Sequence, residues 1–247
     1  MESGVISKLA VVETEEIGAN VTIAEFAVVR KGAKLGKGVV IHPFVVIESG
    51  VTIGDGVEIF PGAYIGKEPK AAGALTRELV FDRHVVIGAN CCIGAYAVIY
   101  YDVEVGESTL IGDGALIREQ TRIGSRSVIG VYVGIGYTCR IGSHTKIMGY
   151  SGVAGKSTVG DNVFISGGVA MANDNQLGRK GWREEENIGV TIEDGAMIGA
   201  GAILLPGVVI GKGAIVGSGA MINANVKPDA LMLAMPARAV PREWHKE

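Results

Sequence analysis

The chain has 247 residues, of which 48% are hydrophobic and only 6% aromatic, and its formal net charge is −3. A slightly acidic chain without runs of like charge gives no reason to expect a nucleic-acid partner. The apolar runs are too short to cross a bilayer, and the first residues lack the layout of a signal peptide. We therefore expect a soluble, cytoplasmic protein that has no membrane partner.

From Ile17 onward the chain repeats with a period of six. A large aliphatic residue stands at every sixth position from Ile17 to Ile65, from Ile87 to Met171 and from Ile192 to Ile222, and the residue four positions later is usually small. This period fits neither an amphipathic helix nor an alternating strand. It predicts an all-β fold in which three short strands form each turn of a triangular prism, with the large aliphatic side chain inside.

The three blocks of repeats hold nine, fifteen and six hexads, hence three, five and two whole turns, or about ten coils. The breaks between the blocks predict two loop insertions, at about 67–86 and 172–191. Each block is a multiple of three hexads, so both loops should leave the prism at the same corner. They should stand five coils apart, or about 24 Å at the spacing of β-strands.

The predicted corners differ in composition. The loop-bearing corner carries a column of functional groups: Tyr101/Asp102, Glu119/Gln120, Tyr137/Thr138, Gly155/Lys156 and Asn173/Asp174. A second corner begins with Tyr96, Tyr132 and Tyr150 and continues as a strip of small residues: Gly167, Gly168, Ala200, Gly201, Ser218 and Gly219. The third corner holds ordinary turn residues. A strip of exposed backbone beside a polar column suits a long, thin ligand, although glycine also suits tight corners.

The repeats resemble those of the hexapeptide-repeat acyltransferases. The stretches "VAMANDNQLG", "IREQTRIG" and "GSGAMINANVKPDALMLAMPARAV" are most similar to the sugar-nucleotide N-acetyltransferases that act on dTDP-3-amino-3,6-dideoxyhexoses. The resemblance implies a left-handed parallel β-helix over residues 1–226 and a C-terminal capping segment, 227–247, with a short helix. It also implies a homotrimer, acetyl-CoA as co-substrate and a nucleotide-sugar substrate in a site between subunits.

The resemblance assigns catalysis to Asn173 and Asp174. Asn173 would donate a hydrogen bond to the thioester carbonyl, and Asp174 would orient the acceptor amine; both residues could instead simply form a turn that opens the loop. We expect contacts to the substrate from Glu119, His84, Tyr137, Arg179 and Trp182, with a solvated corner carboxylate as the plainer interpretation of Glu119. We expect contacts to CoA from the small-residue strip and from Lys212 and Arg238.

Other functions remain open on the sequence alone. An O-acetyltransferase, another small-amine acyltransferase or a noncatalytic β-helix scaffold would share these repeats. A zinc-dependent carbonic anhydrase of this architecture needs three His ligands for each metal ion. The four His residues are scattered, and the three Cys lack metal-ligand spacing. We therefore expect no metal.

Overall fold

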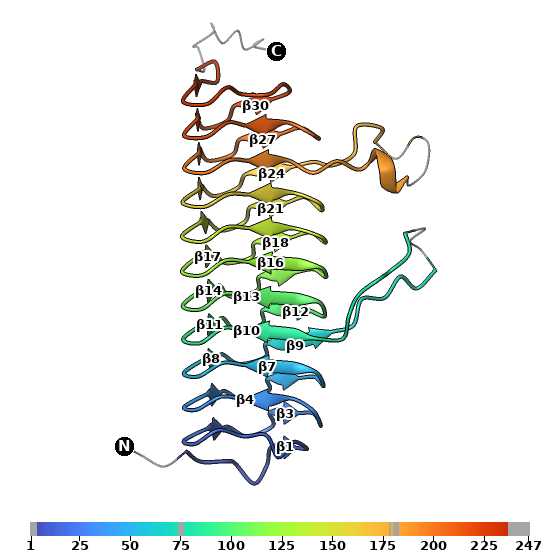
Figure 1. Cartoon of the computed structure of the whole chain (residues 1–247), viewed down its shortest axis with the longest axis vertical. Helices are drawn as coiled ribbons and strands as arrows, with labels where there is room; N and C mark the ends of the chain where they lie inside the picture. The colour runs from blue at the N-terminus through green and yellow to red at the C-terminus, as the bar shows by residue number, and fades with distance from the viewer. Residues whose placement is uncertain (1–3, 74–76, 178, 180–182, 237–247) are drawn as a thin grey trace, which may run out of the picture.

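The protein is a three-sided prism of parallel β-strands. The computed structural model describes residues 4–73, 77–177, 179 and 183–236. It is a left-handed solenoid of about 12 turns, seen from the side in Figure 1. Three parallel sheets of 11, 9 and 11 strands form its sides. The fold class predicted from the period of six is confirmed.

Each sheet takes every third strand of the chain. Sheet A consists of β2 (Thr22–Ile23), β5 (Val40–Ile41), β8 (Glu58–Ile59), β11 (Cys92–Ile93), β14 (Leu110–Ile111), β17 (Val128–Ile129), β20 (Lys146–Ile147), β23 (Phe164–Ile165), β26 (Met197–Ile198), β29 (Ile215–Val216) and β31 (Leu231–Met232). Sheet B consists of β1 (Val11–Val12), β3 (Val28–Val29), β6 (Val46–Ile47), β9 (Tyr64–Lys67), β12 (Val98–Tyr100), β15 (Leu116–Ile117), β18 (Gly134–Ile135), β21 (Gly152–Val153), β24 (Ala170–Met171), β27 (Ile203–Leu204) and β30 (Met221–Ile222). Sheet C consists of β4 (Lys34–Leu35), β7 (Val51–Ile53), β10 (Val85–Ile87), β13 (Val103–Val105), β16 (Thr121–Ile123), β19 (Arg140–Ile141), β22 (Thr158–Val159), β25 (Thr191–Ile192) and β28 (Val209–Ile210).

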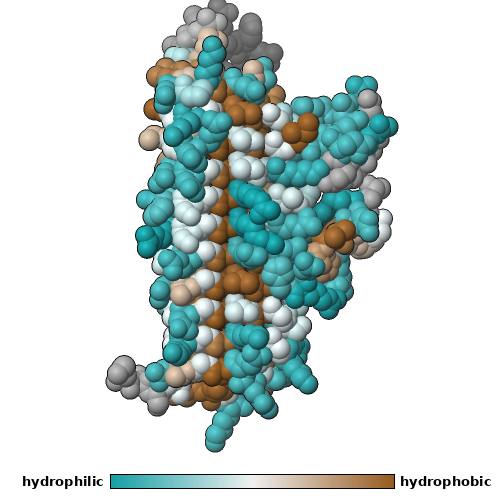
Figure 2. All heavy atoms as spheres, in the orientation of Figure 1, coloured by the Kyte–Doolittle hydropathy of each residue, from teal (hydrophilic) through white to brown (hydrophobic). Residues whose placement is uncertain are grey.

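Inside the prism, the repeated aliphatic residues stack directly above one another. In strands such as β14 and β17, the last residue is buried and the residue before it points outward. Ile111 pairs with Ile129, and Ile129 pairs with Ile147 one coil further on. Backbone hydrogen bonds join each coil only to its neighbours, so the stack is stabilised one interface at a time. Figure 2 shows a narrow hydrophobic column along one side of the prism, with hydrophilic residues on both sides of it.

Both loops leave the prism at the corner between sheets B and C. Loop 1, residues 68–84, joins β9 to β10, and loop 2, residues 172–190, joins β24 to β25. In sheet B, β24 lies five strands beyond β9, and in sheet C, β25 lies five strands beyond β10. The predicted shared corner and five-coil separation are therefore confirmed, and Figure 1 shows both loops projecting on the same side.

The prediction of about ten coils was too low because the repeat changes length at both ends. Val12 pairs with Val29, 17 positions later, and Val216 pairs with Met232, 16 positions later. In the coils between, apart from those interrupted by the two loops, the strands pair at 18 positions, as Lys146 does with Val128. A count in steps of six therefore misses the first and last strands.

The C-terminal segment begins as a continuation of the prism. In its described part, 227–236, β31 adds a strand to sheet A, and we find no helix there. The predicted capping helix can only concern 237–247, which lie outside the described residues. Within the described chain, the sole helix is the short 3-10 turn η1 (Glu184–Glu186) in loop 2.

Candidate functional site

Loop 1 runs up the corner between sheets B and C toward loop 2. Its Arg77 forms an ion pair with Glu119, and the guanidinium carbon lies 4.0 Å from the centroid of the Tyr137 ring. Nearer the foot of the loop, Gln120 donates a hydrogen bond of 2.9 Å to the Val80 carbonyl. Because Tyr137 belongs to the third coil above the one that loop 1 leaves, the loop covers much of the predicted functional column.

Glu119 is a fully buried carboxylate held by two arginines. Its side chain has 0% exposure. It accepts hydrogen bonds from Arg118 Nε at 2.8 Å and Arg118 Nη2 at 3.1 Å, in addition to its bond with Arg77. The interpretation of Glu119 as a solvated corner carboxylate was therefore wrong. A direct contact between Glu119 and substrate would require Arg77 to move, and Glu119 instead fixes loop 1.

The ionisation of Glu119 predicts how stability depends on pH. Burial raises the pKa of its carboxyl, but the hydrogen bonds from Arg118 and Arg77 outweigh burial and leave the pKa lowered overall. A lowered pKa in the folded state contributes stability that is fully present above the unfolded pKa, about 4.3, and is lost as the pH falls through the folded value. We expect Glu119→Gln to destabilise the protein most near neutral pH, and less as the pH drops below about 4. Urea unfolding of both proteins across this range checks the expectation, and a constant difference would contradict it.

His84 lies at the foot of loop 1, where the chain re-enters sheet C. Its Nε2 is 3.9 Å from Asp102 Oδ1 and 3.6 Å from Glu104 Oε1. Asp102 also pairs with Arg122 Nη2 at 2.7 Å. His84 thus belongs to a charged cluster, in the coil just below that of Asp102 and well below the start of loop 2. Its predicted contact with substrate stays a prediction.

Asn173 and Asp174 begin loop 2, and both are half-buried. The Asn173 side chain donates to the Gly155 carbonyl at 3.4 Å. Asp174 Oδ1 accepts a hydrogen bond of 2.6 Å from the backbone N–H of Gln176. This local bond forms the turn that opens loop 2, which is the alternative role predicted for Asp174 from the sequence.

The rest of loop 2 supplies charged groups at its surface. Arg179 is exposed, and its backbone N–H donates to the Gln176 carbonyl at 3.0 Å. Arg183 pairs with Glu186 at 3.5 Å, so part of the basic character of the loop is neutralised within it. Trp182, predicted to contact substrate, lies outside the described residues.

One coil of the column separates the part covered by loop 1 from the start of loop 2. This coil runs from Gly152 to Lys156, between Tyr137 below and Asn173 above; we call it the inter-loop coil. Its outward residue in sheet B, Gly152, is exposed, and Lys156 is half-buried. Within one protomer, the inter-loop coil together with Asn173 and Asp174 forms the candidate site.

The predicted CoA strip lies on a different corner, between sheets A and B. Gly168, Gly201 and Gly219 have φ values of 70°, 66° and 69°, which L side chains rarely adopt. A Cβ at any of the three would meet no atom within 4 Å. The turn geometry thus explains these glycines, while the space beside the strip is open. Gly167, Ala200 and Ser218 precede them in the same turns.

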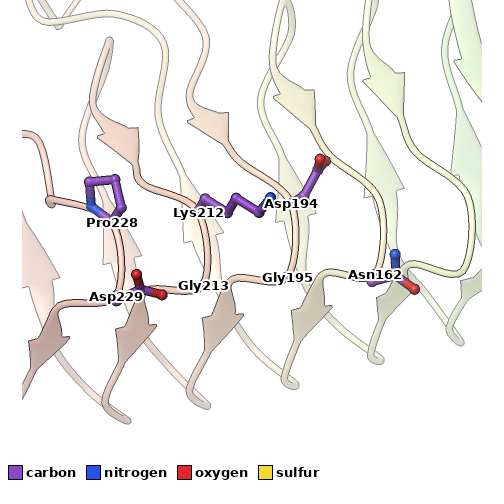
Figure 3. Close-up of a pocket in the computed structure, with 7 residues that line it drawn as sticks. All are labelled: Asn162, Asp194, Gly195, Lys212, Gly213, Pro228 and Asp229. Atoms are coloured by element: carbon purple, nitrogen blue, oxygen red, sulfur yellow. The ribbon is translucent and has the colours of Figure 1, made fainter.

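Lys212 lies on the third corner, between sheets C and A. It lines an open hollow of about 410 Å³ with six other residues: Asn162, Asp194, Gly195, Gly213, Pro228 and Asp229. Figure 3 shows these side chains on successive turns of the corner. Arg238, the other predicted CoA contact, lies outside the described residues. Within one protomer, the column that contains Asn173 and Asp174, the predicted CoA strip and Lys212 therefore lie on three separate corners.

Arg77 and Arg118, which organise the foot of the column, were not predicted as site residues. Arg77 lies in a loop without periodic pattern, and Arg118 lies within the stretch "IREQTRIG". Both sit in a cluster of cations and aromatic rings in which Tyr100 lies 4.5 Å from Lys67 Nζ and 5.1 Å from the Arg118 guanidinium carbon. The adjacent Arg118 and Glu119 were the available signal, because a carboxylate at a buried corner needs a cation nearby.

Two further properties concern the described residues as a whole. They contain no cluster of three or more side chains suited to hold a metal ion. None of their helices has the length and apolar character needed to cross a membrane.

Models of two known protein families match stretches of this chain. Residues 32–67 and 189–224 match the family model "Bacterial transferase hexapeptide (six repeats)", and residues 75–180 match the model of the GMPPB C-terminal domain. A search of curated proteins gave no match. The repeats in residues 32–67 and 189–224 are thus similar to those of bacterial hexapeptide transferases.

Two solved structures resemble the chain over most of its length. The UDP-N-acetylglucosamine acyltransferase of Campylobacter jejuni is 26% identical with a TM-score of 0.60, over 68% of this chain and 67% of that one. The UDP-N-acetylglucosamine O-acyltransferase of Moraxella catarrhalis RH4 is 22% identical with a TM-score of 0.60, over 73% of this chain and 79% of that one. The second likeness concerns the fold alone.

Proposed function

We propose that this protein is an acyltransferase that moves an acetyl group from acetyl-CoA to the amine of a nucleotide-linked amino-deoxy sugar. The observation that carries the proposal is the 26% identity to a UDP-N-acetylglucosamine acyltransferase over 68% of the chain. It supports acyl transfer and a nucleotide-linked sugar as acceptor. The choice of an amine as acceptor rests on the motif that contains Asn173 and Asp174.

Asp174 suits an acceptor that needs orientation more than deprotonation. An amine flanked by sugar oxygens should titrate nearer to an α-amino group, at about 7.7–8.0, than to a lysine near 10.4. A fair fraction of it is then neutral at pH 7, and a carboxylate can hold it in place by a hydrogen bond. We assign the carboxylate of Asp174 to the amine, as an acceptor of its hydrogen bond.

Asn173 is assigned to the thioester. Aminolysis of a thioester develops negative charge on the carbonyl oxygen, which a positioned amide donor stabilises. The amide of Asn173 donates a long bond of 3.4 Å to the Gly155 carbonyl, which a substrate oxygen can replace. The reaction joins the amine nitrogen to the acetyl carbon and breaks the carbon–sulfur bond. The proton lost by the amine reaches the CoA sulfur, directly or through solvent, and CoA leaves as the thiol.

A homotrimer would complete the site. CoA would lie between two copies, against the strip of Gly168, Gly201 and Gly219 or against Lys212, since one protomer holds these groups on corners away from Asn173. The foot of the site would be closed by loop 1.

Thiol release with a panel of acceptors tests the proposal. We expect acetyl-CoA with thymidine- or uridine-diphosphate amino sugars to release CoA, and the matching hydroxy sugars to release none. Release only with hydroxy sugars would assign an O-acyltransferase instead. Millimolar CoA should raise the melting temperature, because a ligand of the folded state stabilises it. No shift and no release would leave the β-helix as a noncatalytic scaffold.

A further inference from the structure

Loop 1 leaves a hollow where it joins the corner between sheets B and C. The neighbouring coils cross this corner by short turns, residues 48–50 between β6 and β7 and residues 101–102 between β12 and β13. In the coil between them, loop 1 replaces the turn, and its two limbs project outward (Figure 1). The Tyr101 hydroxyl spans the gap and donates a hydrogen bond of 3.0 Å to the Ser49 carbonyl. Both residues line a hollow of about 310 Å³, together with Glu48 below and residues of both limbs; we call it the basal pocket.

Two glycines let the base of loop 1 pack closely against the coil below. Gly66 is the extra residue of a bulge in β9 and has a φ of 89°. A Cβ on Gly66 would lie 2.8 Å from the Cβ of Glu48. A Cβ on Gly50, whose φ is 75°, would lie 2.3 Å from the Arg83 carbonyl oxygen. The walls of the basal pocket are therefore fixed by the backbone, and a bulge commonly re-aims a side chain beside a site.

The charged groups of the basal pocket come from the prism and from both limbs of loop 1. The outgoing limb contributes Lys67, Glu68 and Lys70, the returning limb contributes Arg83, and the prism contributes Glu48. Three cations against two carboxylates leave a surplus of one positive charge. Arg83 Nη2 pairs with Glu68 Oε2 at 2.7 Å, but a guanidinium has five N–H donors and can bind a second anion.

Two groups on different sides of the basal pocket keep hydrogen-bonding capacity. Lys70 is exposed, and its ammonium group has no hydrogen bond or ion pair within the described chain. Glu48 is half-buried, and its Oε1 accepts a hydrogen bond of 2.9 Å from the Tyr64 hydroxyl. No cation of the described residues lies within ion-pair distance of the Glu48 carboxylate, although three cations line the same pocket. The hollow thus separates a side that attracts anions from a side that accepts hydrogen bonds.

We propose that the basal pocket binds a small molecule that carries one anionic group and neighbouring hydroxyl groups. Lys70 and Arg83 hold the anionic group, and the Glu48 carboxylate accepts a hydrogen bond from a hydroxyl. The volume of about 310 Å³ lies at the lower end of the range for small-molecule sites, about 300–1,000 Å³. A three-carbon sugar phosphate or hydroxy acid has the right size. This site is separate from Asn173 and Asp174, and it does not depend on the proposed function.

A ligand in the basal pocket would join the two limbs of loop 1, because Lys70 and Arg83 lie on opposite limbs. Further along, the same loop carries Arg77 to Glu119 and Tyr137. Binding at the base therefore reduces the opening of the loop that covers much of the functional column.

Calorimetric titration with chosen probes tests the chemistry of the ligand. We expect glycerol 3-phosphate or glycerate to bind with a dissociation constant of about 1 mM or lower. Sulfate has charge but no donor and should bind at least about tenfold more weakly, and glycerol should not bind. The tighter of the two hydroxylated anions identifies the anionic group. No saturable binding of either, or equal affinity for sulfate, would overturn the proposal.

Three variants test the position of the site. Lys70→Ala should weaken the binding of glycerol 3-phosphate by about tenfold or more. Glu48→Gln should weaken it by about fivefold without weakening sulfate, because a neutral acceptor replaces a charged one. The matched control is Lys31→Ala, an exposed lysine on the same corner one coil below, which should change affinity by less than about twofold. Equal losses in Lys70→Ala and Lys31→Ala would show only an effect of net charge and would overturn the site.

Hydrogen exchange tests the link to loop 1. Saturating glycerol 3-phosphate should slow exchange of the loop 1 amides in the wild type and leave it unchanged in Lys70→Ala. Binding that leaves exchange of loop 1 unchanged in the wild type would overturn the joining of its limbs.

Discussion

Replacement of Glu119 by alanine is expected to lower the free energy of unfolding by about 3–5 kcal/mol, because it leaves the largely buried Arg77 without its counter-charge. The side chain of Glu119 is 0% exposed and that of Arg77 is only 10% exposed. Water can therefore hydrate the Arg77 guanidinium very little once Glu119 is removed. Arg118 is 28% exposed and can turn partly to solvent. Urea unfolding monitored by circular dichroism checks the value.

Two variants make this expectation specific. Glu104→Ala removes a carboxylate that is 51% exposed and pairs with Arg122 at 3.2 Å, and should change stability by less than about 1 kcal/mol. Arg77→Ala leaves the pair of Glu119 and Arg118 in place, so it should destabilise less than Glu119→Ala while increasing proteolysis within loop 1. Equal effects of Glu119→Ala and Glu104→Ala would show that the buried ion pair does not hold the loop.

Asp174→Asn is expected to raise KM for the amino sugar by about 10- to 100-fold, the range for loss of a hydrogen bond to a charged group. We expect kcat to fall far less, because the amine needs no strong base. Asparagine keeps the turn, since its Oδ1 can still accept from the Gln176 N–H. The change therefore removes charge without unfolding the loop, and steady-state kinetics with varied acceptor measure it.

The opposite kinetic pattern would assign a different role to Asp174. A collapse of kcat at saturating acceptor with KM unchanged would identify Asp174 as a general base. Asp55→Asn is the matched control: Asp55 also accepts a hydrogen bond from a backbone N–H, that of Lys37 at 2.7 Å, but far down the prism. Its kinetics should equal those of the wild type.

The repeat made the prism predictable because each inner position is filled by one kind of side chain. Ile111, Ile129 and Ile147 stack because the sequence returns an aliphatic residue every 18 positions. The same arithmetic located the corner of both loops. It failed where a turn was shortened, as between Ile210 and Val226, which pair at 16 positions. A shortened corner shifts the inward-facing positions that follow it, so counting in steps of six no longer finds them.

The candidate site was predictable only in part, since its contacts depend on where an irregular loop lies. Asn173 and Asp174 were found from a break in the repeat. The ion pair of Arg77 with Glu119 joins residues 42 positions apart in the chain. No period relates them, because the path of loop 1 is determined by the groups it meets rather than by a regular pattern. For this reason Glu119 was interpreted as solvated when it is buried.

The constant height of a coil gives the spacing of the loops a further meaning. Loops 1 and 2 stand five coils apart, and each coil contributes 18 residues and about 4.8 Å. Gain or loss of one such unit between the loops would change their separation by a whole step without disturbing the stacking. The separation of the two loops is therefore set by the number of turns between them and can change only in discrete increments.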